Sequence, residues 1–189
     1  EPVKSLAVTR DERYLLVQIG DRRLMAVTST QGTTYWLVNL PEAVVSPLGY
    51  DAFTDSVLLL TRSGWLYAFH GATGTLRPHY PQQLFTGQPT QRATIATLRR
   101  AERKSPYAYV LAQQEMSGSS ATQARMAMVT ILNPYNRYDV PESQMGSQSE
   151  YLPSIAFTGD AVGSFCLVCQ KQAYAGSDQR GIVVAFPVQ

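Results

Sequence analysis

The sequence predicts an all-β chain assembled from repeats of one small antiparallel unit, and two observations support this. Charged residues make up only 16% of the 189 residues, below the usual quarter, and plentiful Ser, Thr and Gln favour strands over exposed amphipathic helices. Four positions recur at a constant offset of 42 residues: Leu16, Leu24, Ala26 and Gly32 match Leu58, Leu66, Ala68 and Gly74. Self-similarity near forty residues, with strand-like runs, is typical of β-propeller blades.

The two echoing units each predict four short strands, from period-two alternation and β-branched or aromatic residues. In the first unit the strands fall at 5–10, 14–19, 23–29 and 33–40, with turns at Asp11-Glu12, Gly20-Asp21 and Gln31-Gly32. In the second unit they fall at 45–52, 56–61, 65–70 and 75–80, with turns at 54–55, 63–64 and 73–74. These turn residues tolerate positive φ or cap a turn.

The remaining sequence predicts two looser units. The third has strands at 93–98, 107–113 and 127–132, with a Ser/Gly/Thr-rich hairpin loop at 116–124. The fourth has strands at 154–158, 165–170 and 181–186 and follows a polar stretch at 142–150. Residues 93–104 fit either a helix ended by Ser105-Pro106 or a strand followed by a loop. We favour the strand because Thr94, Ile95 and Thr97 are β-branched.

We therefore expect one β-propeller-like domain over residues 1–189, with about four antiparallel blades. The fourth unit lacks an outer strand in the sequence. Three explanations are open: a three-stranded last blade, a part of a larger propeller, or an open two-sheet arrangement. An unpaired outer strand is an exposed edge, which favours pairing with a partner strand or with a second copy of the chain.

Residues 63–74, Ser-Gly-Trp-Leu-Tyr-Ala-Phe-His-Gly-Ala-Thr-Gly, resemble a blade of the PQQ-like and WD40-like β-propeller superfamily. The first unit has the same outline at 24–26 and 31–32. Trp36 stands where PQQ-like repeats place a docking tryptophan, whereas the second unit has Pro78 at that offset. We expect small residues Ala26 and Ala68 where neighbouring blades approach closely, and positive φ at the turn glycines Gly32 and Gly74.

The sequence gives little support for catalysis. Its only histidines are His70 and His79, which we interpret as capping or surface residues. It has no paired acidic motif, nucleophile motif or glycine-rich phosphate loop. We expect no catalytic, cofactor-binding or metal-binding residues. The PQQ-like resemblance leaves a quinone-binding enzyme open, but the acidic calcium ligands of such enzymes have no counterpart that we can locate.

Cys166 and Cys169 lie in an apolar run that predicts a strand. Residues three apart on a strand point to opposite faces, so we interpret both as structural thiols rather than a disulfide. Thiols of this kind slightly favour an intracellular, reducing compartment. No apolar run approaches the 18 residues of a membrane span.

The densest charge feature is a basic group of Arg99, Arg100, Arg103 and Lys104. It is either a solvated face or a patch for an acidic peptide, a phosphorylated partner or a nucleic-acid backbone. The formal net charge of +2 does not favour nucleic-acid binding by charge alone. Five tyrosines in or beside loops fit either blade packing or binding hot spots: Tyr50, Tyr80, Tyr135, Tyr138 and Tyr151.

The function that we expect is a non-catalytic scaffold for protein–protein interaction. Its partner would bind through the exposed edge strand or the basic group at 99–104. Two alternatives remain open: a ligand-binding or enzymatic propeller with its pocket in the central channel, and a domain that engages phosphate or nucleic acid through residues 99–104. A channel enzyme needs acidic or histidine side chains from successive blades at one end, and the sequence shows no such series.

Overall fold

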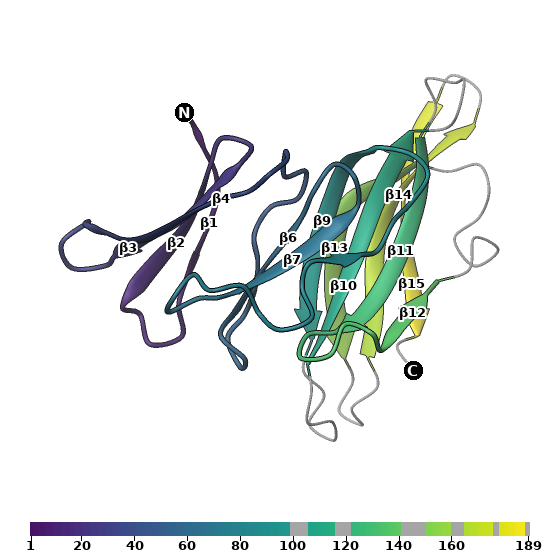
Figure 1. Cartoon of the computed structure of the whole chain (residues 1–189). Coiled ribbons are helices and arrows are strands. Elements are labelled where there is room, and N and C mark those ends of the chain that lie inside the picture. Colours follow the sequence, from purple (N-terminus) through teal and green to yellow (C-terminus); the bar gives the residue numbers. More distant parts are fainter. Residues whose placement is uncertain (99–105, 116–121, 141–149, 160–164, 176–177, 188–189) are drawn as a thin grey trace.

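The computed structural model consists of four antiparallel sheets that follow one another in chain order, forming a row (Figure 1). It describes residues 1–98, 106–115, 122–140, 150–159, 165–175 and 178–187. Within these ranges the regular elements are all strands. Three sheets have four strands and the last has three. The prediction of an all-β, propeller-like chain with about four blades is confirmed, and the row does not close on itself.

The first sheet contains β1 (Val3–Val8), β2 (Tyr14–Ile19), β3 (Arg23–Thr28) and β4 (Thr34–Asn39), in that order. Each end of these strands lies within two residues of the predicted end. The alternation of apolar and polar residues explains the match, because one face of this sheet packs against the second sheet and side chains on a strand point alternately to its two faces. The second sheet contains β5 (Gly49–Asp51), β6 (Ser56–Leu60), β7 (Trp65–His70) and β8 (Gln82–Gln83).

The predicted strand at 75–80 is wrong. Only Leu76 forms a bridge there, to Phe69, and the outer strand is the two-residue β8 instead. Pro78 has no N–H to donate to a ladder, and His79 has a positive φ of 68°, which ends extended pairing. The chain therefore leaves the sheet after Leu76 and returns only at Gln82.

The third sheet contains β9 (Thr90–Leu98), β10 (Tyr107–Glu115), β11 (Thr122–Thr130) and β12 (Arg137–Asp139). The strand interpretation of 93–98 is confirmed, whereas residues 99–104 lie outside the described ranges. β11 begins five residues before the predicted 127, because β10 and β11 pair continuously from Tyr107↔Thr130 to Glu115↔Thr122. The predicted loop at 116–124 is therefore too long, and β12 was not predicted.

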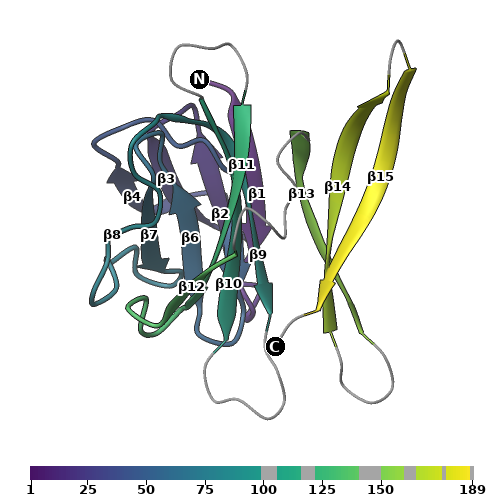
Figure 2. The same ribbon diagram turned by 90° about the vertical axis from the view of Figure 1, so that its right-hand side faces the viewer.

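The last sheet contains β13 (Glu150–Gly159), β14 (Phe165–Ala175) and β15 (Asp178–Pro187). All three are longer than predicted, and both cysteines lie in β14, as expected. In the described residues this sheet has three strands, in the order β13-β14-β15. Figure 2 shows this sheet to one side of the other three, with β13 nearest to them.

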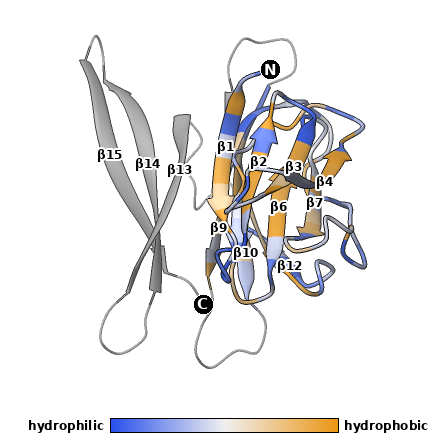
Figure 3. Ribbon diagram, turned by 90° about the vertical axis from the view of Figure 1, so that its left-hand side faces the viewer, coloured by the Kyte–Doolittle hydropathy of each residue, from blue (hydrophilic) through white to orange (hydrophobic). Residues whose placement is uncertain are grey.

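Two hydrophobic clusters join the first three sheets. One, between the first and second sheets, contains Leu16, Leu24 and Ala26; the other, between the second and third, contains their echoes Leu58, Leu66 and Ala68. All six side chains are fully buried. Figure 3 shows the hydrophobic segments along β2, β3 and β6. The echoed residues thus occupy equivalent places, and their burial is the main term that holds the sheets together.

The turn glycines also behave as predicted. Gly32 and Gly74 both have a φ of 68°, which a residue without a Cβ adopts at little cost. A Cβ on Gly74 would lie 2.6 Å from Trp36 Cδ2. The indole N–H of Trp36 donates a hydrogen bond to the carbonyl of Gly71 at 3.0 Å. Trp36 therefore docks the first sheet onto the second, as its place in the repeat predicts.

Candidate interaction face

The strand ends on one side of the molecule are joined by the connections that follow even-numbered strands. Because antiparallel strands alternate in direction, these connections all meet at the same end. We call this end the linker face; it comprises residues 20–22, 40–48, 61–64 and 84–89. The opposite end, the hairpin face, carries residues 9–13, 29–33, 52–55 and 71–81.

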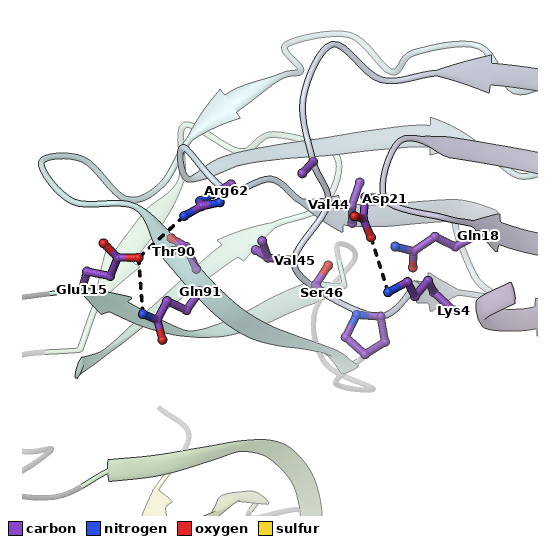
Figure 4. Close-up of a pocket in the computed structure, with 12 residues that line it drawn as sticks. Lys4, Gln18, Asp21, Val44, Val45, Ser46, Arg62, Thr90, Gln91 and Glu115 are labelled. Atoms are coloured by element: carbon purple, nitrogen blue, oxygen red, sulfur yellow. Dashed lines mark hydrogen bonds and ion pairs between the residues drawn. The ribbon is translucent and has the colours of Figure 1, made fainter. Parts of the chain in front are cut away.

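The linker face contains three hollows. The one drawn in Figure 4 has a volume of about 590 Å³ and lies between Lys4, Asp21, Ser46, Arg62 and Glu115. A neighbouring hollow of about 560 Å³ lies beside the connection at 84–89, and a third of about 600 Å³ lies beside the N-terminal residues. All their lining residues belong to the connections of this face or to the strand ends beside them.

Backbone hydrogen bonds hold the β4–β5 connection in the middle of the linker face. The N–H of Val44 donates to the carbonyl of Asp21 at 2.7 Å, and that of Val45 donates to the carbonyl of Leu60 at 2.9 Å. The carbonyl of Val45 accepts from the N–H of Ala93 at 3.0 Å. One connection therefore contacts all of the first three sheets, which fixes the floor of the hollow.

Glu42 fixes the adjoining β6–β7 turn. Its carboxylate accepts hydrogen bonds from the hydroxyl of Thr61 at 2.8 Å and from the hydroxyl of Ser63 at 2.6 and 2.7 Å. Hydrogen bonds to a carboxylate are stronger than those between neutral groups. The position of Arg62, between these two residues, is therefore set by a side chain of the β4–β5 connection.

The rim of the hollow carries charges of both signs. Lys4 Nζ lies 3.4 Å from Asp21 Oδ1, and Arg62 Nη2 lies 3.7 Å from Glu115 Oε1. The side chains of Lys4, Asp21 and Arg62 are half or more exposed. Exposed pairs of this kind are worth little to folding, so their charges can rearrange towards a bound molecule at small cost.

The two histidines lie outside the linker face. His70 ends β7, and burial, together with the charge of Arg77, lowers its pKa. His79 lies in the turn after Leu76, with its ring edge-on to Tyr135 at 5.3 Å. The interpretation of both histidines as capping or surface residues stays a prediction. Among the described residues, no group of three or more His, Cys, Asp or Glu side chains is placed to hold a metal ion.

The predicted binding residues are only partly placed. Arg99, Arg100, Arg103 and Lys104 lie outside the described residues, in the β9–β10 connection, so their role stays a prediction.

Four of the five predicted loop tyrosines have described side chains, and they divide into two pairs. Tyr50 and Tyr80 have packing roles: the Tyr50 hydroxyl donates to Asp55 at 2.9 Å, and that of Tyr80 donates to the carbonyl of Ile131 at 2.9 Å. Burial is the main cause that raises the pKa of Tyr50 to about 12. Tyr135 and Tyr138 are exposed, and the side chain of Tyr151 lies outside the described part of the chain.

Sequence reasoning missed the linker face itself. Its residues come from four connections spread over positions 20–89, and none of these connections carries a motif. The only available signal was the regular alternation of strands, which places every second connection at one end.

Among the residues that the structure describes, no helix has the length and apolar character needed to cross a membrane.

Comparisons with known proteins bear on the fold. No family model matches this sequence, and no curated protein matches it significantly. The β-propeller domain of Cps50 (Swd1) from Myceliophteria thermophila is similar, with 11% identity and a TM-score of 0.57, over 89% of this chain and 49% of that one. The WD40 domain of Toxoplasma gondii coronin is similar at 11% identity and a TM-score of 0.54, over 95% of this chain and 44% of that one.

The chain thus spans about half the length of these two propellers. The computationally designed Ika4 protein, by contrast, matches over 98% of this chain and 91% of its own length, at 13% identity and a TM-score of 0.59. These likenesses confirm the predicted resemblance to WD40-like and PQQ-like propellers. At this level of identity they show the fold alone.

Proposed function

We propose that this chain is a non-catalytic protein-interaction scaffold and that its partner binds the linker face. The observation that carries the proposal is that three hollows open side by side on this one face. Together they form a broad, uneven surface rather than a single deep pocket. A protein surface or an extended peptide suits such a shape better than a small molecule, which binds in an enclosing cleft.

The chemistry of the face also favours a protein partner. Its exposed charges alternate in sign, with Lys4 and Arg62 beside Asp21 and Glu115. A nucleic acid would require a predominantly positive surface. Mixed charges on a rim instead select a partner with the complementary pattern and speed its association. The rigid backbone under the hollow means that little conformational freedom is lost on binding.

The test compares two exposed arginines at opposite ends of the sheets. Arg62 on the linker face and Arg13 on the hairpin face are each 3.7 Å from one carboxylate, and their side chains are 62% and 77% exposed. The whole chain, as wild type, Arg62→Glu and Arg13→Glu, would be used for affinity purification with mass spectrometry. The dissociation constant of each recovered partner would then be measured.

We expect Arg62→Glu to raise the dissociation constant of the partner about tenfold or more, because the reversed charge opposes the complementary charge on the partner. Arg13→Glu should leave the dissociation constant unchanged. Equal binding by both variants, or a loss confined to Arg13→Glu, would place the partner elsewhere. Recovery of no reproducible partner, together with turnover of a small molecule, would overturn the scaffold function and favour the ligand-binding alternative.

A further inference from the structure

The hollow drawn in Figure 4 has polar side chains in its floor as well as charges on its rim. Gln18 comes from β2, Ser46 from the β4–β5 connection and Thr90 from the first position of β9. All three line the hollow, and their exposed fractions are only 2%, 3% and 0%. Buried polar groups in a folded protein are almost always paired by hydrogen bonds, so the bonds that these three side chains make show which of their atoms are still available.

Gln18 and Ser46 each direct a hydrogen-bond donor into the hollow. The hydroxyl of Ser5 accepts from the N–H of Leu48 at 2.9 Å and donates to Oε1 of Gln18 at 2.7 Å. Oε1 is therefore the amide atom on the side of Ser5, and Nε2 is left for the hollow. Figure 4 shows the amide nitrogen directed towards Ser46. The oxygen of Ser46 accepts from the N–H of Leu60 at 2.9 Å, which leaves its hydrogen to donate.

Thr90 has a hydroxyl that the fold does not use. Its backbone N–H donates to the carbonyl of Arg62 at 2.7 Å, but within the described part of the chain its side-chain oxygen has no hydrogen-bond partner. A buried hydroxyl without a partner destabilises a fold, and valine has the same shape without that cost. The hydroxyl is therefore better explained by a bound molecule than by folding.

We infer that an extended segment of the partner crosses this hollow and that its backbone carbonyls accept hydrogen bonds from Gln18, Ser46 and Thr90. The inference rests on the proposed function and names the kind of partner that the face binds. The three donors belong to the first sheet, the β4–β5 connection and the third sheet, so an acceptor that meets all three is long rather than compact. An extended chain presents carbonyls to the same side at every second residue, whereas the carbonyls of a helix are bonded within the helix.

The charges on the rim select among extended segments. Figure 4 shows the pair of Lys4 and Asp21 on one side of Ser46 and the pair of Arg62 and Glu115 on the other. Each pair presents one charge of either sign, so acidic and basic side chains of the segment have a complement at both ends of the hollow. Backbone carbonyls then supply affinity and charged side chains supply specificity. We therefore expect the bound segment to carry charges of both signs.

The experiment selects binders on the immobilised whole chain from two phage-displayed libraries. One library contains random linear peptides, and the other carries the same number of random positions on the surface of a helical hairpin. We expect the linear library alone to give binders. The dissociation constant of the tightest linear peptide is then measured by fluorescence anisotropy for the wild type, Thr90→Val and Thr130→Val, and the Tm of each protein is measured by circular dichroism.

Thr90→Val should raise the dissociation constant about tenfold, the effect of one lost hydrogen bond. Its Tm should be unchanged or higher, because the hydroxyl has no described partner in the free protein. Thr130→Val is the matched control: Thr130 is 7% exposed, its hydroxyl donates to the carbonyl of Asn133, and it ends β11 towards the hairpin face. This variant should lower the Tm and leave the dissociation constant unchanged.

Three outcomes overturn the inference. Selection of no linear peptide, or of helical binders only, contradicts an extended segment. Equal affinity of the wild type and Thr90→Val places the peptide elsewhere. A Tm of Thr90→Val well below that of the wild type shows that the hydroxyl supports the fold. The proposed function is tested separately, because a recovered partner that responds to Arg62→Glu keeps the scaffold function even when no linear peptide responds to Thr90→Val.

Discussion

The first junction between sheets and the second use different residues for the same contact. At the first, the N–H of Trp36 donates to the carbonyl of Gly71, which directly follows β7. At the second, the hydroxyl of Tyr80 donates to the carbonyl of Ile131, which directly follows β11. In both cases an aromatic ring from the outer part of one blade caps the first carbonyl after the third strand of the next.

The contact between neighbouring blades thus persists although its residue and its place in the repeat have changed. The second unit has Pro78 where the first has Trp36, and the positive φ of His79 turns the chain out of the extended pairing. Two residues further on, Tyr80 supplies a buried ring and a donor. The outer strand of the second blade is therefore reduced to the two residues of β8, and Tyr80 provides the contact with the third blade.

The largest effect is expected from Gly74→Val, which breaks the first junction. A side chain there must adopt a φ of 68° and would overlap the Trp36 ring, so we expect a loss of about 2–5 kcal/mol in the free energy of unfolding. Gly32→Val is the matched control, because Gly32 has the same φ but a Cβ at this position would have no other atom within 4 Å. It should lose about 1–2 kcal/mol. Equal losses in urea unfolding would show that the tryptophan contact contributes nothing.

Ala68→Phe tests close packing at the second junction. Ala68 is fully buried in the cluster between the second and third sheets, and a large ring there would push the sheets apart. We expect a loss of about 1–3 kcal/mol, seen as a drop of several degrees in Tm by calorimetry. Ala26→Phe should have a similar effect at the first junction. Unchanged melting would count against the shared register of the two units.

Tyr80→Phe separates the hydrogen bond from ring packing at the second junction, because it keeps the ring and removes only the hydroxyl donor. The buried carbonyl of Ile131 then loses its hydrogen bond, which should cost about 1–2 kcal/mol. Tyr138→Phe is the control, because Tyr138 is 50% exposed and should change stability by less than about 0.5 kcal/mol. If the two variants unfold at the same urea concentration, Tyr80 acts by ring packing alone.

The smallest effect is expected from His70, which ends β7 just before the turn that receives Trp36. Its pKa in the folded protein is lowered, chiefly by burial, so the unfolded chain binds a proton more readily. The stability that neutral His70 contributes is fully present above its unfolded pKa of about 6.5 and is lost as pH falls from there through the lower pKa of the folded state.

The Tm of the wild type should therefore fall more between about pH 7.5 and pH 5.5 than that of His70→Gln. His79→Gln, in the exposed turn, is the control and should follow the wild type. A wild-type curve that is parallel to that of His70→Gln would contradict the lowered pKa.

Much of the fold was predictable from local pattern. The first-sheet strands, the buried echo residues, the docking tryptophan and the turn glycines all follow from alternation and the 42-residue repeat. The prediction of an outer strand at 75–80 was wrong because Pro78 and the positive φ of His79 end the pairing, and β11 starts earlier than predicted because it pairs with β10 over its whole length. The linker face was not predictable, because its residues share a location rather than a motif.

Local pattern alone predicts most of the strands, the repeat and the buried side of the echoing strands, because alternation and backbone preference act over a few neighbouring residues. Which connections meet on one face, and which aromatic ring reaches the next blade, is set by the folding of the chain. These depend on contacts between residues far apart in the chain, such as Tyr80 and Ile131, and no local pattern encodes them.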